Sequence, residues 1–161
     1  MKTCRDLPTD ALATLLARYL MRLSWVADGE AIPGSHWGEP EAGLIGDTLY
    51  VRGDTPLHSA LHECGHYICM DRQRRSSLHT DAGGDYLEEC GVCYLQILLA
   101  DTLPDCSAAA LMEDMDRWGY SFRLGSTRRW FEEDAQDARA WLRAQRLIDE
   151  HDRPTWRLRD P

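Results

Sequence analysis

Two histidines and a glutamate in one short segment could bind a metal ion and take part in catalysis with it. The segment is His62-Glu63-Cys64-Gly65-His66, which has the pattern H-E-x-x-H. On a helix, His62 and His66 lie one turn apart on the same face, so both imidazoles can reach one ion. Zinc accepts imidazole nitrogen at about 2.0–2.1 Å, which suits this spacing. The segment therefore predicts a zinc site that contains His62 and His66.

Glu63 lies beside the two histidines on such a helix and can bond a water molecule rather than the ion. Zinc lowers the pKa of its water to about 7, and a nearby carboxylate can take the proton while the oxygen attacks a carbonyl group. The sequence thus predicts a zinc-dependent metallohydrolase, in particular a metallopeptidase, with Glu63 as the catalytic base. A peptide or protein is the expected substrate.

A catalytic zinc ion usually has three protein ligands and one open position. One known arrangement places Gly and His three and six residues beyond the second histidine. Cys69 and Arg72 stand at those positions, which excludes it. The gluzincin arrangement takes a glutamate from a second, downstream helix instead, and we expect that arrangement here.

Glu88 and Glu89 begin an apolar helix and are the candidates for the third ligand. A carboxylate in apolar surroundings is costly unless it is paired or bound to metal. Cys90 and Gly91 are small and would let the two helices approach closely. This favours Glu89, with Glu88 as the alternative.

Several other polar residues could support the reaction. His58 precedes His62 by one helical turn and could line the cleft or contact a ligand. His79, Tyr86 and Tyr120 are candidates to stabilise an oxyanion on the substrate.

Caps, turn residues and apolar spacing predict the elements that position these residues. Pro56 in a first turn after Asp54-Thr55 begins the H-E-x-x-H helix, at about 56–71. A β-hairpin around Gly46-Asp47 precedes it, with its second strand at 48–52. A loop at 72–84 and a helix at about 85–100 follow. Further helices are expected at about 9–27, 106–118 and 127–150, with a loose tail at about 151–161.

These elements predict an α+β fold. It is mostly helical, with a small β-sheet packed on the H-E-x-x-H helix. A length of 161 residues suits a single domain, 1–161, and 43% apolar residues can form its core.

The composition indicates in which compartment we expect the protein and which classes of partner it disfavours. No apolar run is long enough to cross a bilayer, and no signal-peptide pattern is evident, so we expect a cytoplasmic protein without a membrane partner. The formal net charge of -9 disfavours binding to nucleic acid. The six cysteines are then expected to be reduced thiols. The oligomeric state stays open.

Residues 43–104 resemble the ImmA/IrrE family of compact gluzincin metallopeptidases. The resemblance rests on Gly43 to Val51, on Leu61 to Tyr67, on Glu89 to Tyr94 and on Leu98-Leu99 with Pro104 nearby. It implies a zincin-like fold of minimal gluzincin type, with His62, His66 and Glu89 as metal ligands and Glu63 as the base. It also implies that the strand at 48–52 is an edge that binds an extended peptide.

A weaker resemblance is to the elongation factor P hydroxylase family, which also has an H-E-x-x-H followed by acidic residues and a helical tail. It implies iron as the alternative metal and a non-haem iron hydroxylase as the alternative activity. Two histidines and one carboxylate suit ferrous iron as well as zinc, so the ligands alone do not discriminate. A third interpretation is a catalytically idle metallo-fold that binds protein.

Overall fold

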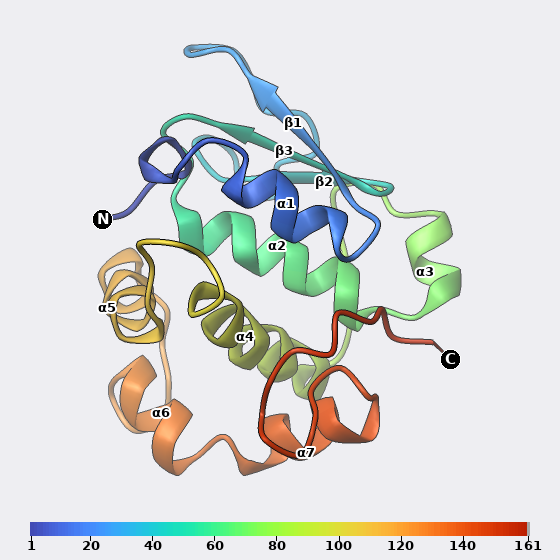
Figure 1. The fold of residues 1–161 in the computed structure, drawn as a ribbon, viewed down its shortest axis with the longest axis vertical. Helices are drawn as coiled ribbons and strands as arrows, with labels where there is room; N and C mark the ends of the chain where they lie inside the picture. The colour runs from blue at the N-terminus through green and yellow to red at the C-terminus, as the bar shows by residue number, and fades with distance from the viewer. Residues whose placement is uncertain (161) are drawn as a thin grey trace.

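The computed structural model describes residues 1–160, which fold as an α+β structure with seven α-helices and a three-stranded mixed sheet (Figure 1). In chain order the elements are the short 3₁₀ helix η1 (Cys4–Asp6), α1 (Ala11–Ala17), β1 (Arg22–Val26), β2 (Gly43–Ile45), β3 (Thr48–Arg52), α2 (Leu57–Cys69), α3 (Arg72–Ser76), α4 (Tyr86–Ala100), α5 (Ala108–Trp118), α6 (Thr127–Glu133) and α7 (Gln136–Ala144).

The sheet has the order β1-β3-β2. The predicted hairpin is confirmed: β2 and β3 pair antiparallel, and Gly46 between them has a φ of 58°, which suits glycine in a tight turn. Strand β1 pairs with β3 in parallel, with Trp25 opposite Val51. The prediction that 48–52 is an edge strand open to a substrate peptide is wrong, because β3 is the central strand and has a neighbour on each side.

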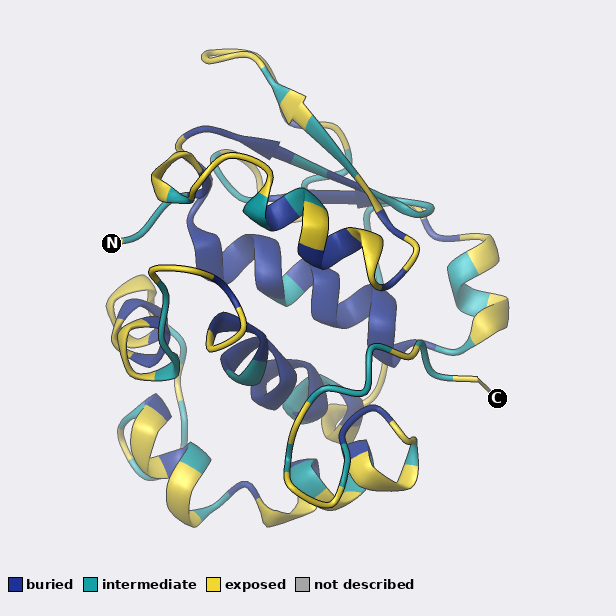
Figure 2. Cartoon of the chain, viewed as in Figure 1, coloured by how far each residue is buried: buried dark blue, intermediate teal, exposed yellow. Residues whose placement is uncertain are grey.

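Helix α2, which carries the H-E-x-x-H segment, lies at the centre of the molecule. The sheet covers one side of it and α4 covers another (Figure 1). The apolar residues Leu61, Cys64 and Ile68 are fully buried, as their spacing predicts. On the face that carries the histidines, His66 is buried as well and His62 is partly buried. Figure 2 shows α2 in the colour of buried residues along almost all its length.

Two glycines allow close packing around α4. A Cβ atom on Gly65 of α2 would lie 3.0 Å from Val92 Cγ1 of α4, so Gly65 permits the approach of these two helices. Gly91 was expected to serve this contact from the other side. It instead faces α7, where a Cβ atom would lie 2.8 Å from the Trp141 ring.

The first helix is shorter than predicted, and its C-terminal part is a strand. Helix α1 ends at Ala17, Leu20 adopts a left-handed conformation with a φ of 61°, and residues 22–26 form β1. Leu23 and Trp25 fit a helical period but also alternate as in a strand. Pairing with β3 therefore overrides the local preference.

The long helix predicted at 127–150 is divided in two. Helix α6 ends at Glu133, and α7 begins at Gln136 after a bend in which Ala135 is buried. The bend lets α7 pack against α4. The predicted loop at 72–84 contains the short helix α3, whose N-cap Asp71 accepts a hydrogen bond from the backbone N–H of Arg74 at 2.9 Å.

The tail was expected to be loose, but residues 154–160 pack on the body of the chain. Trp156 contacts the Tyr19 ring at 5.4 Å, and the Arg18 guanidinium lies 3.4 Å above the Trp156 ring. The backbone N–H of Arg159 donates to the Ile68 carbonyl at the end of α2 at 3.0 Å. Pro161, the last residue of the predicted tail, lies outside the described residues.

Within residues 1–160, no helix has the length and apolar character that crossing a membrane requires.

Candidate metal centre

Three side chains from α2 and α4 converge on one point. His62 Nε2 lies 3.1 Å from His66 Nε2. Glu89 of α4 places Oε1 3.0 Å from His62 Nε2 and Oε2 3.3 Å from His66 Nε2. One ligand atom from each of the three lies within 4.8 Å of the others. The structure thus brings together the two histidines and the glutamate that the sequence singled out.

Glu88 lies on a different side of α4. Its carboxylate accepts hydrogen bonds from Arg74 at 2.8 and 2.7 Å and from Arg159 at 3.1 Å, and its side chain is 5% exposed against 44% for Glu89. Neighbouring residues on a helix point about 100° apart. Only Glu89 can therefore face the histidines while Glu88 pairs with the two arginines.

Gln96 fixes the orientation of His62. The Nδ1–H of His62 donates to Gln96 Oε1 at 2.6 Å, and Gln96 Nε2 donates to the His58 carbonyl at 3.2 Å. The carbonyl oxygen of Gln96 accepts the Nδ1–H of His62, which fixes the ring and directs Nε2 at the convergence point. Burial would lower the pKa of His62, but Tyr120, Cys93 and Glu89 outweigh it and raise that pKa well above 6.5, so in the metal-free chain Nε2 also bears a proton that a bound ion would displace. The sequence interpretation missed Gln96. The signal for it was its position two helical turns after Glu89, on the same face of α4.

The surroundings of His66 and Glu89 lower the pKa of both side chains. Burial, with the nearby charge of His62, lowers the pKa of His66 to about 4, so its imidazole is neutral at physiological pH. Burial would raise the pKa of Glu89, but hydrogen bonding and charge from His62 outweigh it and lower that pKa. Two imidazole nitrogens and an ionised carboxylate are a donor set that fits zinc, and equally ferrous iron.

Glu63 is a buried carboxylate without a hydrogen-bond partner in residues 1–160. Its residue is 7% exposed, and burial raises its pKa to about 7, partly offset by His62. The side chain nevertheless lines the cleft beside the convergence point. A group with this pKa can accept and release a proton near neutral pH.

The cleft has two adjoining parts, of about 400 and about 190 Å³, which share His62, Glu63, Glu89 and Trp37. Tyr120 lines the larger part, where its hydroxyl lies 3.2 Å from His58 Nδ1. His58 itself is buried behind this wall. Tyr86 is 83% exposed, and His79 pairs with the edge of β2; neither lines the cleft. Trp37 and Glu41, in the loop before β2, were not predicted as part of the site.

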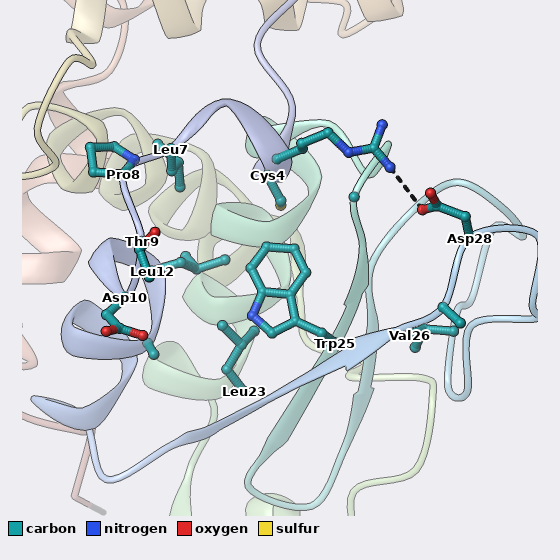
Figure 3. A pocket seen from close by; sticks show the side chains of 14 residues that line it. Cys4, Leu7, Pro8, Thr9, Asp10, Leu12, Leu23, Trp25, Val26 and Asp28 are labelled. Carbon is teal, nitrogen blue, oxygen red and sulfur yellow. Dashed lines mark hydrogen bonds and ion pairs between the residues drawn. The ribbon is translucent and has the colours of Figure 1, made fainter.

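A separate cavity of about 500 Å³ opens between α1 and β1 (Figure 3). Leu12, Leu23 and Trp25 form its apolar wall, and an ion pair of 2.7 Å between Arg5 and Asp28 closes one side. None of the three converging residues lines it.

Comparison of the chain with protein-family models, with curated proteins and with solved structures gave no match.

Proposed function

We propose that this chain is a zinc-dependent metallohydrolase, in particular a metallopeptidase with a zincin-like fold of gluzincin type. One observation carries the proposal: His62, His66 and Glu89 converge next to Glu63, a buried carboxylate with a pKa of about 7 that faces a cleft. The resemblance of residues 43–104 to the ImmA/IrrE family supports the same assignment.

In this mechanism His62, His66 and Glu89 would hold the ion, and Gln96 would keep His62 in the correct orientation. When bound, zinc supplies Lewis acidity that polarises a carbonyl group and makes water more acidic. Glu63 accepts the proton of the attacking water and can return it to the amine of the leaving peptide. Its buried position keeps the carboxylate basic enough for both transfers.

The substrate would contact the walls of the cleft. Strand β3 is not free to pair with a peptide, because β1 and β2 occupy both its edges. Part of the outer edge of β2 is occupied as well, where the N–H of Thr80 donates to the Leu44 carbonyl at 2.9 Å. The residues of the larger part of the cleft, between Trp37 and Tyr120, are then the main candidates to bind the chain that is cut.

A non-haem iron hydroxylase would use the same three ligands. Glu63 favours hydrolysis, because an oxygen-activating iron site has no need of a buried carboxylate base beside its ligands. The metal content of the purified protein discriminates between the two: we expect zinc, and iron in stoichiometric amount would contradict the proposal.

The decisive variant is Glu63→Gln, which keeps the shape of the side chain but cannot accept a proton. We expect zinc content equal to wild type and loss of about 10²–10⁴-fold in the cleavage rate of a quenched fluorescent peptide library. Glu113→Gln, which removes an exposed carboxylate on α5, is the charge-matched control and should keep full activity. If Glu63→Gln retains wild-type activity, or if wild type cleaves nothing in the library, the hydrolase assignment is wrong.

A further inference from the structure

The larger part of the cleft is lined by a carboxylate and two indole rings. Glu41 Oε1 accepts a hydrogen bond from Trp118 Nε1 at 2.6 Å, and Trp37 lines the same wall. Trp37 is 75% exposed and Trp118 is 41% exposed. Both indoles line the same cleft as the candidate metal centre, so both can contact a ligand that enters it.

Apart from its histidines, the ionisable side chains at the walls of the cleft include several carboxylates. Glu41, Glu63 and Glu89 line the larger part, and Asp81 joins Glu63 and Glu89 in the smaller part, whereas neither part is lined by Lys or Arg. A divalent ion at the three ligands would balance the charges of Glu63 and Glu89. Glu41 would remain uncompensated, since no ion pair joins it to a basic residue within the described part of the chain.

Carboxylate and indole together favour a cation. The faces of tryptophan rings attract ammonium and guanidinium groups, and they do so more strongly where water is displaced. An apolar group in the same place would cover Glu41 and remove water from its charge, which is unfavourable, and an acidic group would be repelled. The second carboxylate oxygen of Glu41, which accepts no hydrogen bond from residues 1–160, is available to a ligand. Glu63, whose buried carboxylate accepts no hydrogen bond within residues 1–160, lines the same cleft.

We propose that the substrate presents a lysine or arginine side chain to this wall, close to the bond that is cut, and that Glu41 is a specificity-determining residue with Trp37 and Trp118. The inference rests on the proposed function for the position of the reacting bond. The preference for a cation follows from the cleft lining itself.

The test is binding of three peptides that differ at one residue: acetylated, amidated Ala-Ala-X-Ala-Ala with X as lysine, norleucine or glutamate. The protein is zinc-loaded Glu63→Gln, in which turnover cannot consume the ligand, and the signal is indole fluorescence. We expect the lysine peptide to bind about tenfold more tightly than the norleucine peptide and the glutamate peptide to bind most weakly. Equal binding of all three, or tighter binding of the norleucine peptide, overturns the inference.

Variants then assign the preference to one residue. Glu41→Gln in the same background should bring the lysine and norleucine peptides to within about twofold, and Glu41→Lys should favour the glutamate peptide. Glu113→Gln removes the same charge outside the cleft and should keep the lysine preference. If Glu113→Gln and Glu41→Gln reduce the preference equally, only the net charge matters and Glu41 has no specific role.

Cleavage of the same peptides by wild-type protein separates this inference from the proposed function. Cleavage without a lysine preference in rate or binding contradicts the inference but supports the proposed hydrolase activity. A lysine preference in binding without any cleavage has the reverse meaning. It supports the cation-binding site and contradicts the proposed hydrolase activity.

Discussion

Gln96 links the candidate metal centre to the interior of the fold through a single side chain. It accepts a hydrogen bond from His62 and donates one to the backbone of His58. We expect Gln96→Leu to weaken zinc binding by about 10- to 100-fold, because His62 loses the partner that fixes its ring. Competition with a chromophoric chelator measures the zinc affinity. Gln73→Leu, on the exposed face of α3, is the control, and equal affinities for all three proteins would show that Gln96 does not position His62.

His58 makes stability depend on pH. Burial, with the charge of His62, lowers its pKa from 6.5 to about 4, so the folded chain resists protonation where the unfolded chain accepts it. The unfolded state therefore binds more protons between these values, and stability falls as the pH drops from 6.5 toward 4. The full shift corresponds to about 3 kcal/mol.

The measurement is urea unfolding of metal-free wild type and His58→Gln over that pH range. We expect the wild type to lose more stability on acidification than His58→Gln, which has no group to protonate there. Parallel pH profiles would show that His58 is not the source of the effect.

At the residue scale, the sequence predicts the relations between residues that lie close together in the chain. His62 and His66 are one turn apart on any helix, so their common face followed from the motif alone. The choice between Glu88 and Glu89 depends on the rotational phase of α4 against α2. The spacing of Gln96 from Glu89 places both on one face of α4, but its contact with His62 depends on the tertiary fold, as does the position of Glu41, which no spacing in the sequence reveals.

At the scale of elements, the site depends on the packing of α2 against α4. Gly65 provides the close approach, with Val92 in contact. We expect Gly65→Val to cost about 1–3 kcal/mol of stability through overpacking and to weaken zinc binding, because it moves Glu89 away from the histidines. Thermal unfolding and the chelator titration measure the two effects.

The second variant in this experiment combines Gly65→Val with Val92→Ala. The smaller side chain at position 92 makes room for the valine at position 65. The double variant should recover part of both losses. If Gly65→Val leaves zinc affinity unchanged, the distance between α2 and α4 does not control the site.

The elements that the sequence predicts well are those whose signals agree. Pro56 is the N-cap residue of α2, without a side-chain cap hydrogen bond, Asp85 caps α4, and Gly46 marks the hairpin turn. The errors lie where two periods fit the same residues. Residues 22–26 suit a helix or a strand, and pairing with β3 decides for the strand. The single long helix predicted at 127–150 is broken because α7 packs on α4 only after a change of direction.

At the scale of the whole molecule, the C-terminal segment connects α2 with α4, the helices that carry the three candidate ligands. Arg159 Nη1 donates to the Cys69 carbonyl at 3.2 Å and to Glu88 at 3.1 Å, so it joins the end of α2 to the start of α4. Arg75 Nη2 of α3 donates to the Arg159 carbonyl at 2.6 Å. The segment therefore stabilises the region from which His66 and Glu89 project.

We expect Arg159→Ala to lower the free energy of unfolding by about 1–3 kcal/mol, because the buried carboxylate of Glu88 loses one of its two cations. Urea unfolding measures the loss. Arg157→Ala, which removes an exposed arginine two residues away, should cost less than about 0.5 kcal/mol. Equal effects of the two substitutions would show that the contact of Arg159 with Glu88 contributes nothing specific.

The metal site at the junction of α2 and α4 is the central claim, and anomalous scattering from crystals of the purified protein tests it most directly. We expect one peak per chain, present above the zinc absorption edge and lost below it, in contact with His62 Nε2, His66 Nε2 and the Glu89 carboxylate. The absence of a peak at these three side chains from a zinc-supplemented crystal, or a peak that follows the iron edge, would contradict the account.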